Sequence, residues 1–289
     1  MRVTVSSTLG MLFLAGAGAC VPPSRSAPPP QDAAYAFTPG ETLRYRKHSE
    51  WSTTDLAGNH QLGASRYRRD SRFAITFTGD GRARAWIESS RIEERGDTGP
   101  ATVETAGTGV VGLPFALAVG PRGSDSTLSS PSFPPSWSGM AGQFNSFFPR
   151  LPGGPLVLGS HWTDSGTNEV QDSNFVTLSS YYTAYRVTGT GRIRGEDVVV
   201  IEYHSTETSR QRLRNPPREG SYPYGMSDLA SQTDVRVDGV VYFAPRSGRL
   251  VRRTWTSETS FSRPSGNLEA AVQETSARVT IDLISARRE

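Results

Sequence analysis

Histidine and serine are the side chains of this sequence most suited to chemistry, and their spacing indicates no catalytic or metal site. No two histidines have the H-x-H or H-x3-H spacing that brings two imidazoles to one metal ion. No serine lies in a G-x-S-x-G elbow, and the zinc-protease, P-loop and Rossmann patterns are absent from the sequence. We therefore expect no catalytic residue, no metal and no cofactor, with a hydrolase that leaves no motif as an alternative. The histidines are His48, His60, His161 and His204.

The single cysteine, Cys20, follows a segment typical of an export signal. A positive start at Met1-Arg2 precedes the apolar run Leu9–Ala15, and small residues lead up to the cysteine. The run is too short to cross a bilayer, which takes about 20 residues. We expect a signal peptide over 1–19, and Ala17-Gly18-Ala19 fits the ordinary signal peptidase.

The sequence Ala17-Gly18-Ala19-Cys20 also resembles a lipobox, although Ala17 stands where Leu is usual. The resemblance implies a lipoprotein in which Cys20 carries diacylglycerol and an acyl chain such as palmitate. The alternative is a secreted protein whose first mature residue is Cys20. Exported proteins usually pair their cysteines, so a lone cysteine favours lipidation. Because Val21 replaces the Asp that signals inner-membrane retention, the resemblance implies the outer membrane, facing the periplasm.

The charges are almost balanced, with 31 Lys and Arg against 28 Asp and Glu. No basic face is evident, so we expect no nucleic-acid partner. The clusters Arg44-Tyr45-Arg46-Lys47 and Arg66-Tyr67-Arg68-Arg69 alternate basic and aromatic residues. We interpret both as solvated faces of strands, and a phosphate-binding patch is the alternative. Lys47 is the only lysine of the sequence.

Alternation of apolar residues predicts a mainly β protein with long antiparallel strands, forming either a half-open barrel or two similar β lobes. Phe73, Ile75 and Phe77 share one side of a strand, and Asp80-Gly81 supplies a hairpin turn. The predicted regions are a signal peptide (1–19), a Pro- and Ser-rich tether (20–38), a first β region (39–123), a loop, helix and Pro-rich corner (124–158) and a second β region (159–289).

One substantial helix is predicted near 134–148. Its apolar residues recur at helical spacing, Pro134 and Pro135 suit a helix start, and Pro149 would end it. The apolar residues are Trp137, Met140, Ala141, Phe144, Phe147 and Phe148.

The stretch from Phe147 to Trp162 resembles an F-P-x-L-P…V-x-x-G-x-x-W box of uncharacterised bacterial envelope lipoproteins. Ser160 stands where that box usually has an acidic residue, and the turn Phe243–Leu250 is similar to a later motif of such proteins. The resemblance implies a half-open β structure, distantly like the half-barrel lipoprotein carriers of the periplasm, and no catalytic residue. The matching residues are Phe148, Pro149, Leu151, Pro152, Val157, Gly159 and Trp162.

We expect a non-enzymatic, lipid-anchored envelope protein in which the helix covers a concave sheet that binds an apolar or lipid ligand. In a simpler interpretation the box is only a rigid corner. The alternative function is a structural or assembly lipoprotein that binds an envelope protein. The membrane is an expected partner through the lipid on Cys20. The residues predicted to line the ligand cavity are Phe73, Phe77, Trp86, Trp137, Phe144 and Trp162.

Overall fold

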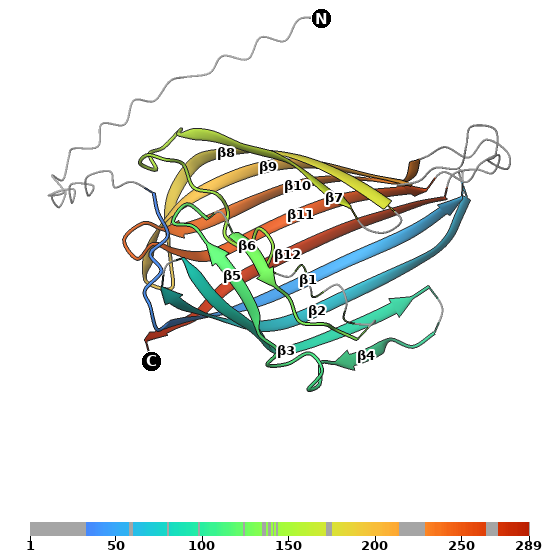
Figure 1. The fold of residues 1–289 in the computed structure, drawn as a ribbon, viewed down its shortest axis with the longest axis horizontal. Coiled ribbons are helices and arrows are strands. Elements are labelled where there is room, and N and C mark those ends of the chain that lie inside the picture. The colour runs from blue at the N-terminus through green and yellow to red at the C-terminus, as the bar shows by residue number, and fades with distance from the viewer. Residues whose placement is uncertain are drawn as a thin grey trace, which may run out of the picture.

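A computed structural model describes residues 33–288 with gaps at 58–59, 80, 98, 124, 135–136, 138–139, 141, 143, 172–174, 214–228 and 264–270. Cys20 therefore lies outside the described residues. Twelve strands form one antiparallel sheet in the order β6-β5-β3-β2-β1-β12-β11-β10-β9-β8-β7, with β4 paired to β3 (Figure 1). The strands are Glu41–Ala57 (β1), His60–Gly79 (β2), Arg82–Gly96 (β3), Thr102–Thr105 (β4), Phe115–Val119 (β5), Asp125–Ser129 (β6), His161–Gln171 (β7), Phe175–Ile193 (β8), Glu196–Leu213 (β9), Leu229–Ala244 (β10), Arg249–Arg263 (β11) and Ala271–Arg288 (β12).

The predicted β class and the half-open architecture are confirmed, and the alternative of two similar β lobes is not what the structure shows. β1 pairs with β12 along its whole length, from Glu41 opposite Arg288 to Ala57 opposite Ala271. This pairing joins the two predicted β regions into one sheet. Among the described residues, the edge strands β6 and β7 pair only with β5 and β8, so the sheet stays open.

Successive residues of each strand point to opposite sides of the sheet. The inner face carries the buried residues Leu43, Tyr45 and Phe73, whereas the outer face carries charged residues such as Arg46. Figure 1 shows the sheet curving so that β5, β6 and β7 lie in front of its central strands. The hydrophobic core therefore lies on one side of the sheet.

The link from β6 to β7, residues 130–160 and here called the crossing segment, packs over the inner face. The Phe147 ring meets Tyr45 edge-on at 5.0 Å, and Phe144 meets Phe73 at 5.5 Å. The predicted helix near 134–148 is wrong, because the described residues there form turns, 3-10 positions and irregular backbone. Ser146 has a positive φ of 52°, which an α-helix cannot contain. The apolar residues of the crossing segment are spaced as they are because their side chains are buried against the sheet, and not because the backbone is helical.

Residues 33–38, predicted as the end of the tether, are part of the folded structure. Ala33 and Tyr35 are buried, and the Tyr35 hydroxyl donates a hydrogen bond to the Pro149 carbonyl at 2.9 Å. The Tyr35 ring also contacts Phe148 and Phe243 edge-on. From Ala33 onward, the described chain therefore packs against the sheet.

In the part of the chain that the structure describes, no helix has the length and hydrophobicity needed to span a membrane.

Candidate functional site

Four of the six residues predicted to line a cavity lie in the packed core instead. Phe73, Phe77 and Phe144 have no more than 1% of their surface exposed, and Trp137 has 3%. Phe144 contacts both Phe73 and Phe115, with ring centroids 5.5 and 4.8 Å apart. These side chains hold the crossing segment to the sheet, and the space between them is filled.

The other two predicted residues lie apart from this core. Trp86 lies on β3 between Ala85 and Ile87, which face inward, so its side chain lies on the outer face. Trp162 lies on the inner face of β7, where it stacks on Tyr185 at 5.1 Å. Its indole nitrogen donates a hydrogen bond to the Arg150 carbonyl at 2.9 Å.

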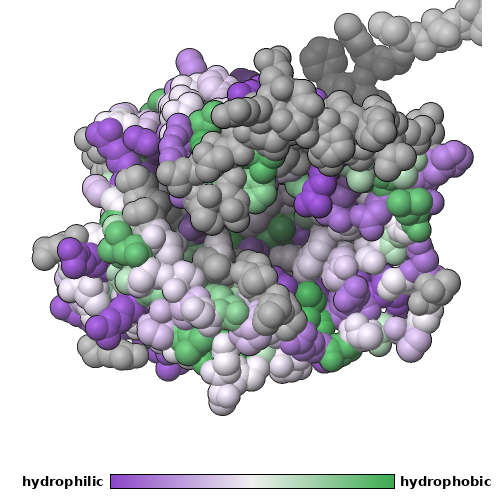
Figure 2. All heavy atoms as spheres, turned by 45° about the vertical axis from the view of Figure 1, so that its right-hand side comes forward, coloured by the Kyte–Doolittle hydropathy of each residue, from purple (hydrophilic) through white to green (hydrophobic). Residues whose placement is uncertain are grey.

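Open space on the inner face begins beside the crossing segment. A pocket of about 330 Å³, here called the inner pocket, lies between this segment and strands β7 to β11. Ligand pockets range from about 300 to 1,000 Å³. Figure 2 shows the molecule hollowed where the inner face opens, with hydrophobic residues visible inside the hollow. Its lining includes Phe148, Tyr181, Tyr203, Ser205, Val237 and Arg253.

Next to the inner pocket, the inner face carries aromatic residues that are only half-buried. Trp51 and Tyr67 are cross-strand neighbours whose rings stack 5.0 Å apart. Trp255 belongs to β11, two strands from β1. Val279 of the intervening strand β12 lies opposite Trp255 on one side and opposite Ser49 of β1 on the other. All three rings are half-buried and are not enclosed by the core as Phe73 is. They offer apolar surface that an incoming molecule can still cover.

Three cations lie among these rings: Lys47, Arg69 and Arg253. The Lys47 ammonium lies 5.7 Å from the centre of the Trp255 ring, and the Arg253 guanidinium lies 4.8 Å from the same ring. Arg69 lies 5.3 Å from the Trp51 ring. We call Lys47, Arg69, Arg253, Trp51 and Trp255 the cationic floor. Such cation–π contacts stabilise a charge only partly, by about 0.5–2 kcal/mol each.

The environment of the cationic floor disfavours the charge on Lys47. Burial, together with the neighbouring charges of Arg69 and Arg253, lowers its pKa to about 8. Burial also lowers the pKa of Arg69, which the carboxylate of Glu104 opposes. Positive charge is therefore concentrated at a place where burial disfavours the charged forms of Lys47 and Arg69.

Sequence reasoning missed the cationic floor. Lys47 and Arg69 belong to the clusters interpreted as solvated strand faces, but they face inward. The signal was present in the alternation, because Lys47 follows Leu43 and Tyr45 at even spacing. Arg69 stands at even spacing from Phe73 in the same way.

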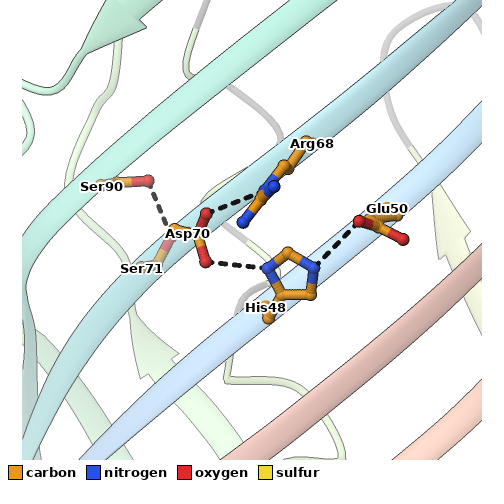
Figure 3. Close-up of polar contacts among 6 residues, drawn as sticks. All are labelled: His48, Glu50, Arg68, Asp70, Ser71 and Ser90. Atoms are coloured by element: carbon orange, nitrogen blue, oxygen red, sulfur yellow. Dashed lines mark hydrogen bonds and ion pairs between the residues drawn. The ribbon is translucent and has the colours of Figure 1, made fainter.

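The outer face carries two shallow hollows. The hollow of about 910 Å³ is lined mainly by charged and polar residues, whereas the hollow of about 800 Å³ presents mainly apolar surface. Near them His48 lies between two carboxylates, with Nδ1 2.8 Å from Asp70 and Nε2 3.2 Å from Glu50 (Figure 3). Burial raises the pKa of the Asp70 carboxyl, but the hydrogen bond and charge of His48 and the charge of Arg68 bring it below its usual value. A second pair joins His204 to Asp238 at 2.8 Å.

These pairs do not form a nucleophilic triad. Both ring nitrogens of His48 contact carboxylates, so neither is available to take a proton from a serine. Ser71 and Ser90 bond to each other at 2.7 Å and are buried, whereas Asp70, next to Ser71 in the strand, faces the opposite side. Among the described residues, no group of three or more histidine, cysteine, aspartate or glutamate side chains could hold a metal ion.

No protein-family model and no curated protein sequence matches this chain. Among solved structures, a structure of lipovitellin entitled "Lipid-protein interactions in lipovitellin" is similar over 88% of this chain, at 15% identity and a TM-score of 0.44. This chain spans 26% of the length of that one. OccK2 (OpdF) of Pseudomonas aeruginosa, in complex with glucuronate, is similar over 86% of this chain and 100% of its own, at 7% identity and a TM-score of 0.28. A mutant Rh. blastica porin is similar over 82% of this chain and 99% of its own, at 9% identity and a TM-score of 0.23.

Proposed function

We propose that this chain is a lipid-anchored envelope protein that binds an amphiphilic ligand in the inner pocket and catalyses no reaction. The observation that carries the proposal is the inner pocket itself, because it adjoins aromatic rings that the fold leaves half-buried. A pocket lined by apolar rings and a few charged groups is suited to a molecule with an apolar part and a polar part.

The outer face differs from the inner pocket in how its charges are arranged. Its rows alternate acidic and basic side chains, as in Glu93, Arg68, Glu50 and Arg278, which are successive cross-strand neighbours. Charges of opposite sign at this spacing partly satisfy one another. The inner face instead combines half-buried rings with small hydroxyl residues such as Ser205 and Thr183, which bond to each other at 2.8 Å.

The anchor is proposed from the sequence pattern at Cys20, and the outer membrane facing the periplasm is the proposed location. The test is to replace Cys20 with Ala and to compare detergent phase partitioning and radiolabelled palmitate incorporation with the unaltered protein. We expect the unaltered protein to enter the detergent phase and to be labelled, and the variant to do neither. An unaltered protein that stays in the aqueous phase and takes up no label contradicts the anchor.

The binding proposal is tested with two substitutions on the same strand. Val237 lines the inner pocket, whereas Val240 lies on the outer face and lines the 800 Å³ hollow. Both are half-buried, so Val237→Trp and Val240→Trp add similar bulk to opposite sides of β10. The full chain carrying Cys20→Ala is titrated with dodecyl phosphate and with dodecanol by isothermal calorimetry.

We expect Val237→Trp to weaken binding of both amphiphiles about tenfold or more, and Val240→Trp to leave it unchanged, because only the first fills the inner pocket. Near-ultraviolet circular dichroism checks that both variants keep their packing. The proposal is wrong if neither amphiphile binds the Cys20→Ala chain, or if Val240→Trp is the variant that loses binding.

A further inference from the structure

The three cations of the cationic floor lack the acidic partners that other basic residues of this sheet have. Arg252, next to Arg253 in β11, faces outward and bonds to Asp282 at 2.6 Å. Arg44 on the outer side bonds to Glu88 at 2.8 Å. Among the described residues, no carboxylate lies within ion-pair distance of Lys47, Arg69 or Arg253. Within β11, the outward-facing arginine therefore has an acidic partner, whereas the inward-facing one has none among the described residues. Elsewhere on the inner side, Arg150 and Asp164 of the inner-pocket lining form an ion pair at 3.1 Å.

The contacts that these cations do make are weak or incomplete. Arg69 donates from Nη1 to the sulfur of Met140 at 3.3 Å, a poor acceptor, and its Nε is buried without a hydrogen-bond partner. Lys47 has its contact with the Trp255 ring and no hydrogen bond or ion pair with another described residue. These two side chains therefore retain N–H groups that can donate hydrogen bonds to the oxygen atoms of a ligand.

Arg253 connects the cationic floor to the inner pocket. Its Nε donates to the Tyr203 hydroxyl at 3.0 Å and its Nη1 to the Ser146 carbonyl at 2.5 Å. It lines the inner pocket and also contacts Trp255, the ring over which Lys47 lies. A ligand in the inner pocket can therefore reach the cationic floor without crossing the packed core.

Leaving positive charge partly desolvated and unpaired is unfavourable, and an anion relieves this cost by forming charge-assisted hydrogen bonds. Carboxylate and phosphate oxygens match the fork of donors on a guanidinium. The flanking Trp51 and Trp255 rings would then cover the apolar atoms next to the charged group.

We propose that Lys47, Arg69 and Arg253 bind the anionic headgroup, a carboxylate or a phosphate monoester, of the amphiphile in the inner pocket. This inference rests on the proposed function, since the headgroup belongs to the ligand that the inner pocket holds. It narrows the ligand class to anionic amphiphiles.

The test compares four probes by isothermal calorimetry on the full chain carrying Cys20→Ala: dodecyl phosphate, dodecanoate, dodecanol and inorganic phosphate. The same chain is prepared with Lys47→Met, Arg69→Met and Arg69→Lys. Arg46→Met is the matched control, because Arg46 is exposed on the opposite face of the strand that carries Lys47.

We expect dodecyl phosphate and dodecanoate to bind at least tenfold more tightly than dodecanol or inorganic phosphate. Each methionine variant of Lys47 or Arg69 should lose about tenfold or more for the two anionic amphiphiles and nothing for dodecanol, since a charged hydrogen bond contributes on the order of a factor of ten. Arg69→Lys should keep part of the affinity, and Arg46→Met all of it. In addition, the ¹⁵Nζ signal of the single lysine should shift on addition of dodecyl phosphate.

The outcomes separate this inference from the function on which it rests. Equal affinity for dodecanol and dodecyl phosphate, with no loss in the methionine variants, overturns the headgroup assignment and leaves the amphiphile site standing. Equal affinity for inorganic phosphate and dodecyl phosphate supports an anion site but contradicts an amphiphile as its ligand. Binding of no probe contradicts both.

Discussion

Replacing Lys47 with Met should stabilise the fold at neutral pH. Burial and the charges of Arg69 and Arg253 lower the pKa of Lys47 from 10.5 to about 8, so the folded protein holds the ammonium unfavourably below pH 8. Methionine keeps the volume and apolar character of the side chain without the charge. The substitution therefore removes a destabilising charge and keeps the packing.

The size of the effect follows from that pKa. Each unit is about 1.4 kcal/mol, which sets an upper bound of roughly 3 kcal/mol for the cost of the charge. Lys47 is half-buried by surface area, so solvent screens part of this cost. The lost cation–π contact with Trp255 subtracts a further ~0.5–1 kcal/mol. We expect Lys47→Met to raise the free energy of unfolding by about 1–2 kcal/mol at pH 7.

The stability that Lys47→Met adds should become smaller as the pH rises. Because the folded pKa of Lys47 lies below its unfolded value, the unfolded chain binds more protons between pH 8 and 10.5. The unaltered protein therefore gains stability relative to the Met variant as pH rises through 8, and the gap narrows by pH 9.5.

Urea denaturation at pH 7.0, 8.5 and 9.5, followed by tryptophan fluorescence and circular dichroism, measures the gap between the Cys20→Ala chain and its Lys47→Met variant. Arg46→Met is the control and should change stability by no more than about 0.5 kcal/mol. A variant less stable than its parent at pH 7, or a gap that is constant with pH, would refute the reasoning.

Two further stability changes follow from close contacts. A Cβ on Gly239 would lie 2.5 Å from the Tyr203 ring, whereas one on Gly63 meets nothing within 4 Å, so Gly239→Ala should cost about 1–3 kcal/mol and Gly63→Ala far less in urea denaturation. Equal effects at the two glycines would contradict the described packing. Ser71→Ala should cost about 1–3 kcal/mol because it leaves the buried Ser90 hydroxyl unpaired, and adding Ser90→Ala should recover part of that loss. Strict additivity of the two serine changes would show that the hydroxyls are not coupled.

The strands could be predicted from local pattern, because alternation reports directly which side of a strand is buried. Phe73, Ile75 and Phe77 were assigned to one side, and they lie in the core. The union of the two β regions could not be predicted, since the pairing of β1 with β12 joins residues more than two hundred positions apart. Nothing in the local pattern distinguishes that pairing from two separate lobes.

The helix was wrongly predicted because the buried side chains of the crossing segment recur at a spacing similar to that of a helix. Trp137, Met140 and Phe144 are all buried, as an apolar helix face would be, but the described backbone around them forms turns and 3-10 positions. Small residues in this stretch, such as Gly142 and Ser146, favour turns over helix. Apolar spacing therefore identified which residues are buried and misidentified the backbone.

The candidate site was only partly predictable. The alternation of the sequence alone could exclude Trp86, since Ala83, Ala85 and Ile87 recur at a spacing of two and Trp86 lies between them. The residues predicted to line the cavity are large aromatic side chains, and large aromatic side chains are also the ones that fill the core. The cationic floor depends on which strands adjoin, because Arg253 meets Lys47 across β12 through Ile281. Only the sheet order brings those two charges together.

Native mass spectrometry of the protein purified gently from its source tests the central claim most directly. We predict the mass of the chain with any lipid on Cys20, plus a further non-covalent mass of an anionic amphiphile. That further mass should be absent from protein carrying Val237→Trp and present in protein carrying Val240→Trp. A spectrum with no non-covalent adduct, under conditions that preserve known protein–lipid complexes, or an adduct that Val237→Trp does not remove, would contradict a ligand site on the inner face.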